Sequence, residues 1–518
     1  MDLKILNKNL IIICILVFIL GLFARIYTIT LKEDFHQDEA LSIILANYSE
    51  DGWTKLPDTN VEFTGKEIKQ KMFWNDKTLK DTLSDIGNLY LYTRDDSHSN
   101  LYYTSLRLAF NGVDKFNAKQ TIYRGCAINL IAYCLAFFFM FKILALLFKN
   151  SNLVPFGLFV AFLNTASISA SAYLKPYALQ ETAFIIVTYY FILLMRKEII
   201  NPIKPALAIA FSFLTGYYSL IYVGILAVIL FAKNLDKKYL LKIAGLSILA
   251  TTIFYPGYFL GIISYRATET VDRFLNLGSN LFYTAVNLPL IYFKFLFSLS
   301  IIFVLIFMIF FIKKNNLKIS DTNLSIIPKL FFIGLIWSAI ILFIAPYKIL
   351  RYILPIFPIM TLIIPYIVSY FDKKIASITL ICSIMLLNLY IAIEFHKNPN
   401  LGKYIPVISK LEFIRNNKTK DFLFKETLSQ PVYLLKQEND LSIGEVIEFS
   451  DIITHLDDNQ KYIFINPNTI INSKQFYLLV PKFPKDNFFI LAEPYYNNYK
   501  RLKIQDSSTY FSCIEFKH

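Results

Sequence analysis

The sequence predicts a polytopic α-helical membrane protein with about eleven transmembrane helices, a long first outer loop and a small C-terminal α/β domain. Of its 518 residues 55% are hydrophobic and only 17% are charged, and the mean hydropathy is +0.47. Such a composition excludes an ordinary soluble protein. Apolar runs of about 20 residues, long enough to cross a hydrocarbon core, recur along the chain. Lys and Arg gather in alternate short loops, as they do on the cytoplasmic side of membrane proteins.

The first apolar run, residues 9–30, is longer than the hydrophobic part of a signal peptide and is followed by no small-residue cleavage site. We therefore expect it to be retained as the first span. The remaining spans are expected at residues 122–148, 152–172, 177–195, 203–216, 217–232, 240–262, 284–312, 327–346, 349–371 and 375–394.

The run 203–232 is long for one span and short for two. Charge parity favours two helices that turn at Gly216, because a single span would move the later basic loops to the outer side. This count makes the N-terminus cytoplasmic. The first loop, residues 31–118, and the tail, residues 395–518, then lie on the extracytoplasmic side. We expect residues 1–394 to form the transmembrane domain.

The tail alternates helix-like pieces with short β-like runs bounded by Asn, Pro and Asp, which predicts a small α/β domain. The strand-like runs are DFLFKE, GEVIEFS, KYIFIN, NFFILAEP and YFSCIEF. The sequence contains no Gly-rich phosphate loop and no zinc-type spacing of Cys and His. Its five cysteines form no evenly spaced disulfide framework. The net charge of +14 lies mostly in loops between spans, which argues against nucleic-acid binding.

The first acidic group follows the first span, where Asp34 precedes the adjacent pair Asp38 and Glu39. In the run DEALSIILANY the apolar residues fall on one helical face. We therefore expect a helix along the membrane surface with its acidic start toward a cavity. The expected face holds Leu41, Ile44, Leu45 and Tyr48. The competing interpretation is that the two acids only complement the positive helix N-terminus.

A second acidic group, Asp95 and Asp96, lies near the end of the first loop in the run RDDSHSNLYYTSLRLAF. His98 follows two residues later. Like the first acidic group, this one precedes an amphipathic run. The competing interpretation is a solvated turn with a structural histidine.

Two cations lie close to predicted span ends on the outer side: Lys175 in SAYLKPYALQETAF and Arg351 in APYKILRYILPIFP. Ionisable residues at membrane depth are costly and tend to mark sites or pathways. Each can instead be a snorkelling anchor, with Tyr177 and Tyr352 as interfacial aromatics. Together the two cations suggest the capture of a lipid phosphate.

Five segments resemble, in order, motifs of the lipid-phosphosugar-dependent glycosyltransferases of the GT-C class. The branch concerned is akin to the protein O-mannosyltransferases and lipid A aminoarabinose transferases. The segments are HQDEALSIILA, DSHSNLYY, LKPYAL, TGYYSLIY and RYILPIFP. The resemblance covers residues 1–394. Two departures stand out, because Ser99 and Asn100 replace two prolines and Lys175 replaces an arginine.

The resemblance implies a GT-C-like fold and a sugar donor carried on a polyprenyl phosphate. It implies transfer to an acceptor hydroxyl at the extracytoplasmic face of a bacterial inner membrane. Asp38 is then the leading general base, with Glu39 and Asp96 supporting it or binding the acceptor. The donor phosphate is expected at Lys175, Tyr177, Arg351 and Tyr352, and His98 is a candidate for acceptor or metal binding. A single base with direct displacement implies inversion at the anomeric carbon.

Two other functions stay open from the sequence. A transporter or flippase of a lipid-linked saccharide would also have many spans, but the sequence shows no inverted repeat and its acids lie in an outer loop. A polysaccharide polymerase or ligase at the outer face would use related chemistry. The expected partners are the lipid-linked donor, membrane lipids and an acceptor that is a lipid, glycan or protein. No cofactor is certain, and a divalent metal requirement stays open.

Overall fold

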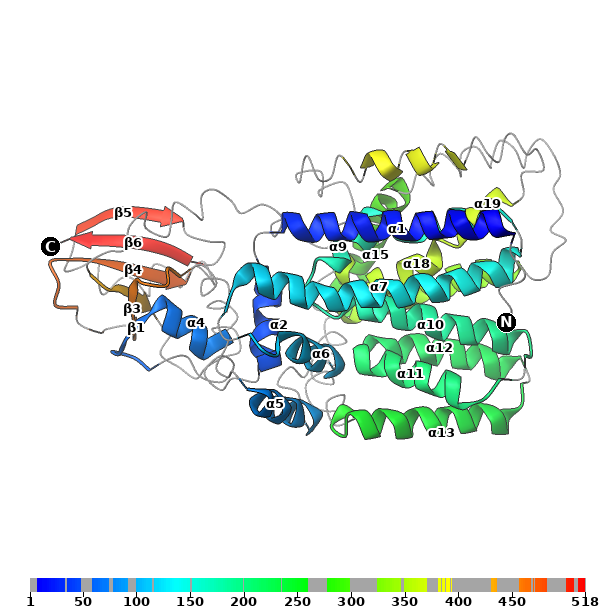
Figure 1. Ribbon diagram of the computed structural model, residues 1–518, viewed down its shortest axis with the longest axis horizontal. Coiled ribbons are helices and arrows are strands. Elements are labelled where there is room, and N and C mark those ends of the chain that lie inside the picture. The colour runs from blue at the N-terminus through cyan, green and yellow to red at the C-terminus, as the bar shows by residue number, and fades with distance from the viewer. Residues whose placement is uncertain are drawn as a thin grey trace. The chain divides into compact units, whose positions relative to one another are not determined.

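The computed structural model describes residues 7–32, 35–47, 58–73, 78–91, 99–113, 116–149, 151–198, 200–233, 235–259, 277–298, 324–345, 349–369, 381–382, 384–386, 388–391, 393, 430–435, 456–466, 469, 471–481, 500–506 and 511–517. The chain divides into two compact units (Figure 1). The first, here called the helical unit, comprises Met1–Leu31, Tyr90–Tyr102 and Cys126–Lys410. The second, here called the sheet unit, comprises Lys32–Leu89, Tyr103–Gly125 and Leu411–His518.

Four helices within the described residues are long and apolar enough to cross a membrane: α1 (Lys8–Leu31), α7 (Ala118–Phe148), α10 (Tyr177–Met195) and α17 (Ile326–Ile344). A fifth span is formed if α8 (Leu153–Phe162) and α9 (Thr165–Ser171), which meet at a bend of 59°, count as one. The protein is therefore an integral membrane protein. These elements agree with the spans expected from the apolar runs.

Further helices of the helical unit lie within the described residues. They are α11 (Ile203–Thr215), α12 (Tyr218–Ala232), α13 (Lys237–Phe254), α15 (Leu277–Ser298), α18 (Phe357–Met360) and α19 (Ile363–Val368), with the 3-10 turns η2 (Leu350–Tyr352) and η3 (Leu354–Ile356). In place of one regular span at 349–371, the chain forms short helical pieces. Pro355, Pro358 and Pro365 explain the breaks, because proline lacks an amide proton and clashes with the preceding helical turn.

The run 203–232 forms two helices, α11 and α12, separated by Gly216 and Tyr217, as the loop charges required. A Cβ atom at Gly216 would overlap Nε2 of Gln180, so a larger residue here would displace that side chain. The same Gln180 Nε2 donates a hydrogen bond of 2.9 Å to the Thr215 carbonyl oxygen. The Gln180 side chain of α10 thereby provides a hydrogen-bond donor for a backbone carbonyl at the end of α11.

Helix α10 is the most buried of the four long helices and packs against α9, α11, α12 and α18. In Figure 1 its axis is roughly aligned with those of α11, α12 and α13. An aromatic group anchors its middle: the rings of Phe184 and Tyr222 stack at 4.4 Å, and Trp337 meets Phe184 edge-on at 5.1 Å. The Tyr222 and Thr188 hydroxyls are 2.6 Å apart, so the buried Tyr222 hydroxyl has a partner.

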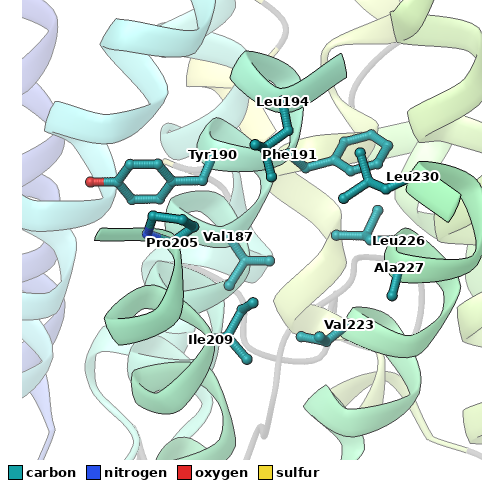
Figure 2. Close-up of a pocket in the computed structure, with 10 residues that line it drawn as sticks. All are labelled: Val187, Tyr190, Phe191, Leu194, Pro205, Ile209, Val223, Leu226, Ala227 and Leu230. Carbon is teal, nitrogen blue, oxygen red and sulfur yellow. The ribbon is translucent and has the colours of Figure 1, made fainter. Parts of the chain in front are cut away.

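Two apolar hollows lie between α10, α11, α12 and α13. Figure 2 shows the smaller one, where side chains from α10, α11 and α12 converge. Its lining residues are Val187, Tyr190, Phe191, Leu194, Pro205, Ile209, Val223, Leu226, Ala227 and Leu230. The larger one, of about 300 Å³, shares Leu194, Ile209 and Val223 with it and reaches Phe213 and Phe259. Their linings lack charged side chains, so neither is a site for ionic chemistry.

The sheet unit contains β1 (Glu62–Thr64), β2 (Val432–Leu435), β3 (Lys461–Ile465), β4 (Gln475–Pro481), β5 (Lys500–Asp506) and β6 (Phe511–Lys517). Within the described residues these strands form one sheet in the order β1-β3-β2-β4-β6-β5. Strand β2 is parallel to both β3 and β4, and the other pairs are antiparallel. The predicted runs KYIFIN and YFSCIEF coincide with β3 and β6. The runs DFLFKE, GEVIEFS and NFFILAEP lie outside the described residues.

Strand β1 comes from the first loop, yet it belongs to the sheet built by the tail. It pairs antiparallel with β3, with Glu62 opposite Ile463. Two ion pairs reinforce this join, Lys461 with Glu62 at 2.7 Å and Lys69 with Asp458 at 2.8 Å. The first loop and the tail therefore fold together, which no local pattern in the sequence indicated.

The sheet unit also holds helices α2 (Gln37–Asn47), α4 (Gly65–Phe73), most of α5 (Leu79–Leu91) and most of α6 (Leu101–Phe110). Helix α2 corrects one expectation, because it is buried all round from Ala40 to Asn47 and shows no solvent-facing side there. The face opposite the predicted apolar stripe consists of small or apolar residues such as Ser42 and Ile43. These residues do not resist burial, so the expected division of this helix into an apolar and a solvent-facing side is wrong.

Candidate active site

The candidate site in the helical unit begins at the break between α8 and α9. Asn164 fills this break, since its Oδ1 accepts a hydrogen bond of 3.0 Å from the Ser167 amide. Its Nδ2 donates to the carbonyl oxygens of Val160 and Ala161 at 3.1 and 2.9 Å. One side chain thus caps the start of α9 and satisfies the end of α8. A break at membrane depth needs such partners for its freed backbone groups.

Residues 172–176 form the turn between α9 and α10 and carry Lys175. Asn129 of α7 holds this turn from outside, because its Nδ2 donates to the carbonyl oxygens of Ser171 and Tyr173 at 3.2 and 2.9 Å. The Lys175 amide closes the turn by donating to the Tyr173 carbonyl at 2.8 Å. The backbone at Lys175 is therefore fixed by defined hydrogen bonds.

The Lys175 side chain is the unusual feature of this turn. The residue is only 4% exposed, and its ammonium has no hydrogen bond or ion-pair partner among the residues that the structure describes. A buried ammonium without a counter-charge is costly, and the cost falls when an anion binds beside it. The turn therefore presents a cation that is ready for an anionic ligand.

Arg351, in η2, contacts the 172–176 turn through Tyr173. Its Nη1 donates a hydrogen bond of 3.1 Å to the Tyr173 hydroxyl oxygen. The Tyr173 ring in turn stacks on the ring of Tyr177, with centroids 6.0 Å apart. The guanidinium also lies 5.6 Å from the ring centre of Tyr352. The structure thus connects Arg351, Tyr352 and Tyr177 to the turn that carries Lys175.

Tyr173 and Asn129 are central to this arrangement, but the sequence did not assign them a role. For Tyr173 the available signal was its place two residues before Lys175. For Asn129 the available signal was an amide side chain within a long apolar run. Polar side chains inside a span usually satisfy backbone groups or mark a site, and Asn129 does the former.

In the sheet unit, the two adjacent acids of the first loop differ sharply. Glu39 is fully buried, and its Oε2 lies 2.8 Å from Nζ of Lys32, which is also fully buried. The same Oε2 accepts a 2.7 Å hydrogen bond from the His36 amide. These contacts fix the Glu39 carboxylate at the first turn of α2.

Asp38 keeps a partly exposed side chain, with 28% of its surface accessible. Its Oδ2 is 3.4 Å from Nδ1 of His36. That nitrogen also accepts a 3.1 Å hydrogen bond from the Asp38 amide, so it acts as an acceptor in this arrangement. Asp38 is therefore the acid of this pair that a ligand can reach.

The second acidic group, with Asp96 and His98, lies outside the described residues. The two residues that follow it tie the segment to the helical unit, because the Ser99 hydroxyl donates to the Leu214 carbonyl and the Asn100 Nδ2 donates to the Phe254 carbonyl. Within the described ranges, no three or more His, Cys, Asp or Glu residues gather as metal ligands.

The chain matches no family model and no curated protein. Its structure is similar to the crystal structure of ArnT from Cupriavidus metallidurans bound to undecaprenyl phosphate. The likeness covers 97% of each chain with a TM-score of 0.53 and 9% sequence identity. Against ArnT from the same organism in the apo state, over the same shares of both chains, the TM-score is 0.36 at 8% identity, which adds nothing. The chain therefore has the ArnT-like GT-C fold.

Proposed function

We propose that the chain is a membrane glycosyltransferase that moves a sugar from a polyprenyl-phosphate donor to an acceptor hydroxyl. The observation that carries the proposal is Lys175, a residue that is only 4% exposed and whose ammonium has no partner among the described residues. The ArnT structure that shares this fold was solved with undecaprenyl phosphate, a ligand of the chemistry that such a cation would bind. A phosphate on a lipid tail would approach a cation at the end of a span from within the membrane.

Lys175 and Arg351 are assigned to the donor phosphate, with Tyr177 and Tyr352 beside them. When the sugar leaves, the bond between its anomeric carbon and the phosphate oxygen breaks, and negative charge develops on the phosphate. Cations placed at that oxygen stabilise the transition state more than the ground state. Arg351 is oriented by its hydrogen bond to Tyr173, whereas Lys175 supplies a point charge.

Asp38 is assigned as the general base, since its side chain is partly accessible. Its carboxylate would take the proton of the acceptor hydroxyl while the acceptor oxygen forms a bond to the anomeric carbon. Direct displacement of this kind inverts the configuration at that carbon. The buried Glu39, paired with Lys32, suits a supporting role. Asp96 remains assigned to acceptor binding, and His98 to acceptor or metal binding.

The reaction is placed at the extracytoplasmic face of a bacterial inner membrane, with the N-terminus in the cytoplasm. This orientation follows from the distribution of Lys and Arg among the loops. The joint fold of the first loop and the tail supports it, because both segments must then lie on one side. The acceptor class is a lipid, a glycan or a protein.

The test is binding of undecaprenyl phosphate to the purified protein in nanodiscs, followed by transfer from defined polyprenyl-phosphate sugars with and without EDTA. Lys175→Gln and Arg351→Gln should each weaken binding by about 10- to 100-fold, as for the loss of a charged hydrogen bond. Lys175→Arg should bind like the parent, because it keeps the charge. Lys238→Gln, at an exposed position of α13, is the matched control.

Normal phosphate binding by both Gln variants would show that the two cations only anchor helices. Binding without transfer of any sugar to any acceptor class would instead favour a transporter or flippase.

A further inference from the structure

Three polar side chains meet inside the helical unit and play no part in the proposed chemistry: Arg25 of α1, Ser167 of α9 and Glu181 of α10. Arg25 Nη2 donates a hydrogen bond of 2.7 Å to the Ser167 hydroxyl. That hydroxyl donates in turn to Glu181 Oε1 at 3.1 Å. All three residues are buried. The serine thus links a guanidinium to a carboxyl group, and this trio is called the Arg25 bridge below.

Neighbouring groups on α1 and α7 hold the Arg25 side chain in position. Its Nη1 donates to the Gly21 carbonyl at 3.0 Å, and its guanidinium carbon lies 3.8 Å from the ring centre of Tyr133. Tyr133 is itself fixed, because its hydroxyl donates to the Phe18 carbonyl at 3.0 Å. Residue 21 must be glycine, since a Cβ atom there would overlap the Tyr133 hydroxyl.

Burying the Arg25 bridge between three helices costs desolvation free energy. Buried ion pairs are often no more stabilising than apolar residues of similar volume, and charges at membrane depth tend to mark functional places. Generic packing between α1, α9 and α10 would need no charge at all. The position of the bridge therefore calls for a reason beyond helix packing.

The bridge joins the two helices on either side of the 172–176 turn. Ser167 is on the short helix before the 172–176 turn, and Glu181 is in the second turn of the helix after it. Their hydrogen bond spans the two ends of the turn that carries Lys175. Because α9 has only seven residues, fixing Ser167 fixes the start of the turn.

We propose that the Arg25 bridge positions Lys175 for phosphate binding. The bridge clasps the α9 and α10 ends of the turn and ties them to α1, so that the turn holds the ammonium in place. This inference rests on the proposed function. Arg25, Ser167 and Glu181 are positioning residues and act through Lys175.

The experiment is a double-mutant cycle on the dissociation constant for undecaprenyl phosphate, measured with the full chain in nanodiscs. Ser167→Ala cuts the bridge with the smallest change in volume and should raise the dissociation constant about 10-fold in the parent. In a Lys175→Gln background the same change should have less than about a twofold effect, because the group it positions is gone. Ser167→Thr keeps the hydroxyl and should restore parent binding.

Ser169→Ala is the matched control, since that serine is on the same short helix and donates to the Ala166 carbonyl of its own helix. It should leave phosphate binding unchanged. Glu181→Leu provides a second route if Ser167→Ala folds poorly, because Leu removes the acceptor oxygen of the bridge. It should show the same dependence on Lys175.

Equal effects of Ser167→Ala in the two backgrounds would overturn the proposal, because the bridge would then act on general stability. An unchanged dissociation constant in the parent background would overturn it as well. Failure of the proposed function looks different: Lys175→Gln alone would then leave phosphate binding intact. If Lys175→Gln weakens binding and the cycle shows no coupling, only the positioning role is lost.

Discussion

Each of the two units buries a lysine, and the two lysines are treated in opposite ways. Lys32 in the sheet unit lies 2.8 Å from the Glu39 carboxylate, with both side chains fully buried. Lys175 in the helical unit is nearly as buried but has no partner among the described residues. A matched pair at fixed distance stabilises the local fold, whereas an unmatched cation costs free energy until a ligand arrives. Burial alone therefore does not distinguish the two lysines, whereas the presence or absence of a counter-charge among the described residues does.

The sharpest test of this contrast concerns the two acids of the first loop, of which one is matched and the other is accessible. Asp38→Asn should lower the rate of sugar transfer by about 10²- to 10⁴-fold, because it removes the proton acceptor while keeping the shape. Expression and thermal stability should stay near those of the parent, since Asn is also a good residue at a helix start. Transfer assays in nanodiscs measure the effect. A parent-like rate would remove Asp38 from the mechanism and point to Asp96.

Breaking the matched pair should cost stability. Lys32→Met leaves the Glu39 carboxylate buried without its counter-charge, and such a change typically costs about 3–5 kcal/mol. The double variant Lys32→Met/Glu39→Leu removes both charges and should recover most of the loss. Denaturant titration in detergent, followed by fluorescence, measures the free energy of unfolding. If Lys32→Met were as stable as the parent, the pair would not be a stabilising contact.

Replacing Lys175 should affect stability in the opposite direction to replacing Lys32. Lys175→Met removes a charge that has no partner among the described residues, so the ligand-free protein should be as stable as the parent or more stable. Saturation with undecaprenyl phosphate at about 100 times its dissociation constant should stabilise the parent by about 2.7 kcal/mol and the variant much less. The thermal midpoint with and without ligand reports both effects. A large loss of stability in the ligand-free variant would mean that Lys175 is a structural residue.

The smallest effect is expected at an exposed acid that has built-in partners. Glu67 and Thr64 form a capping box at the start of α4: the Thr64 amide and hydroxyl donate to Glu67 Oε2 at 2.7 and 2.9 Å, and the Glu67 amide donates to the Thr64 hydroxyl. Thr64→Ala should cost about 1 kcal/mol in the free energy of unfolding.

These hydrogen bonds also lower the pKa of the Glu67 carboxyl from its ordinary value. Because the pKa is lower in the folded than in the unfolded chain, the contribution is complete at neutral pH. It disappears as the pH falls through the folded-state pKa. The difference in stability between the parent and Thr64→Ala should therefore shrink in acid, as denaturant titrations at several pH values would show. If the stability difference between the parent and Thr64→Ala did not change with pH, the capping hydrogen bonds would not depend on the charge of the Glu67 carboxylate.

The sequence predicted what depends on local composition. The apolar runs at 9–30 and 177–195 correspond closely to α1 and α10, and the loop charges identified the α11 and α12 pair. The lone cations Lys175 and Arg351 could also be picked out, because charges are conspicuous among apolar neighbours. Their roles stay predictions, as do those of Asp38 and Glu39.

What the sequence could not indicate depends on contacts between distant segments. The link between Arg351 and the Lys175 turn runs through the Tyr173 hydroxyl, which has no signature in the order of residues. The burial of α2 on all sides depends on what packs around it, and its periodicity alone suggested a surface helix. The partner of Arg25 lies on a helix more than a hundred residues away.

The pairing of β1 with β3 has a consequence for biosynthesis. Lys69 and Asp458, which bond beside this join, are 389 positions apart in the chain. At translation rates of about 5–20 residues per second, β1 emerges about 20 to 80 s before its partner exists. During that interval the helices of the helical unit that follow α1 are made, while the edge of β1 stays unpaired. A ribosome that stalls late in the message therefore leaves a protein with its spans inserted and its first loop unfinished, a natural substrate for quality-control proteases.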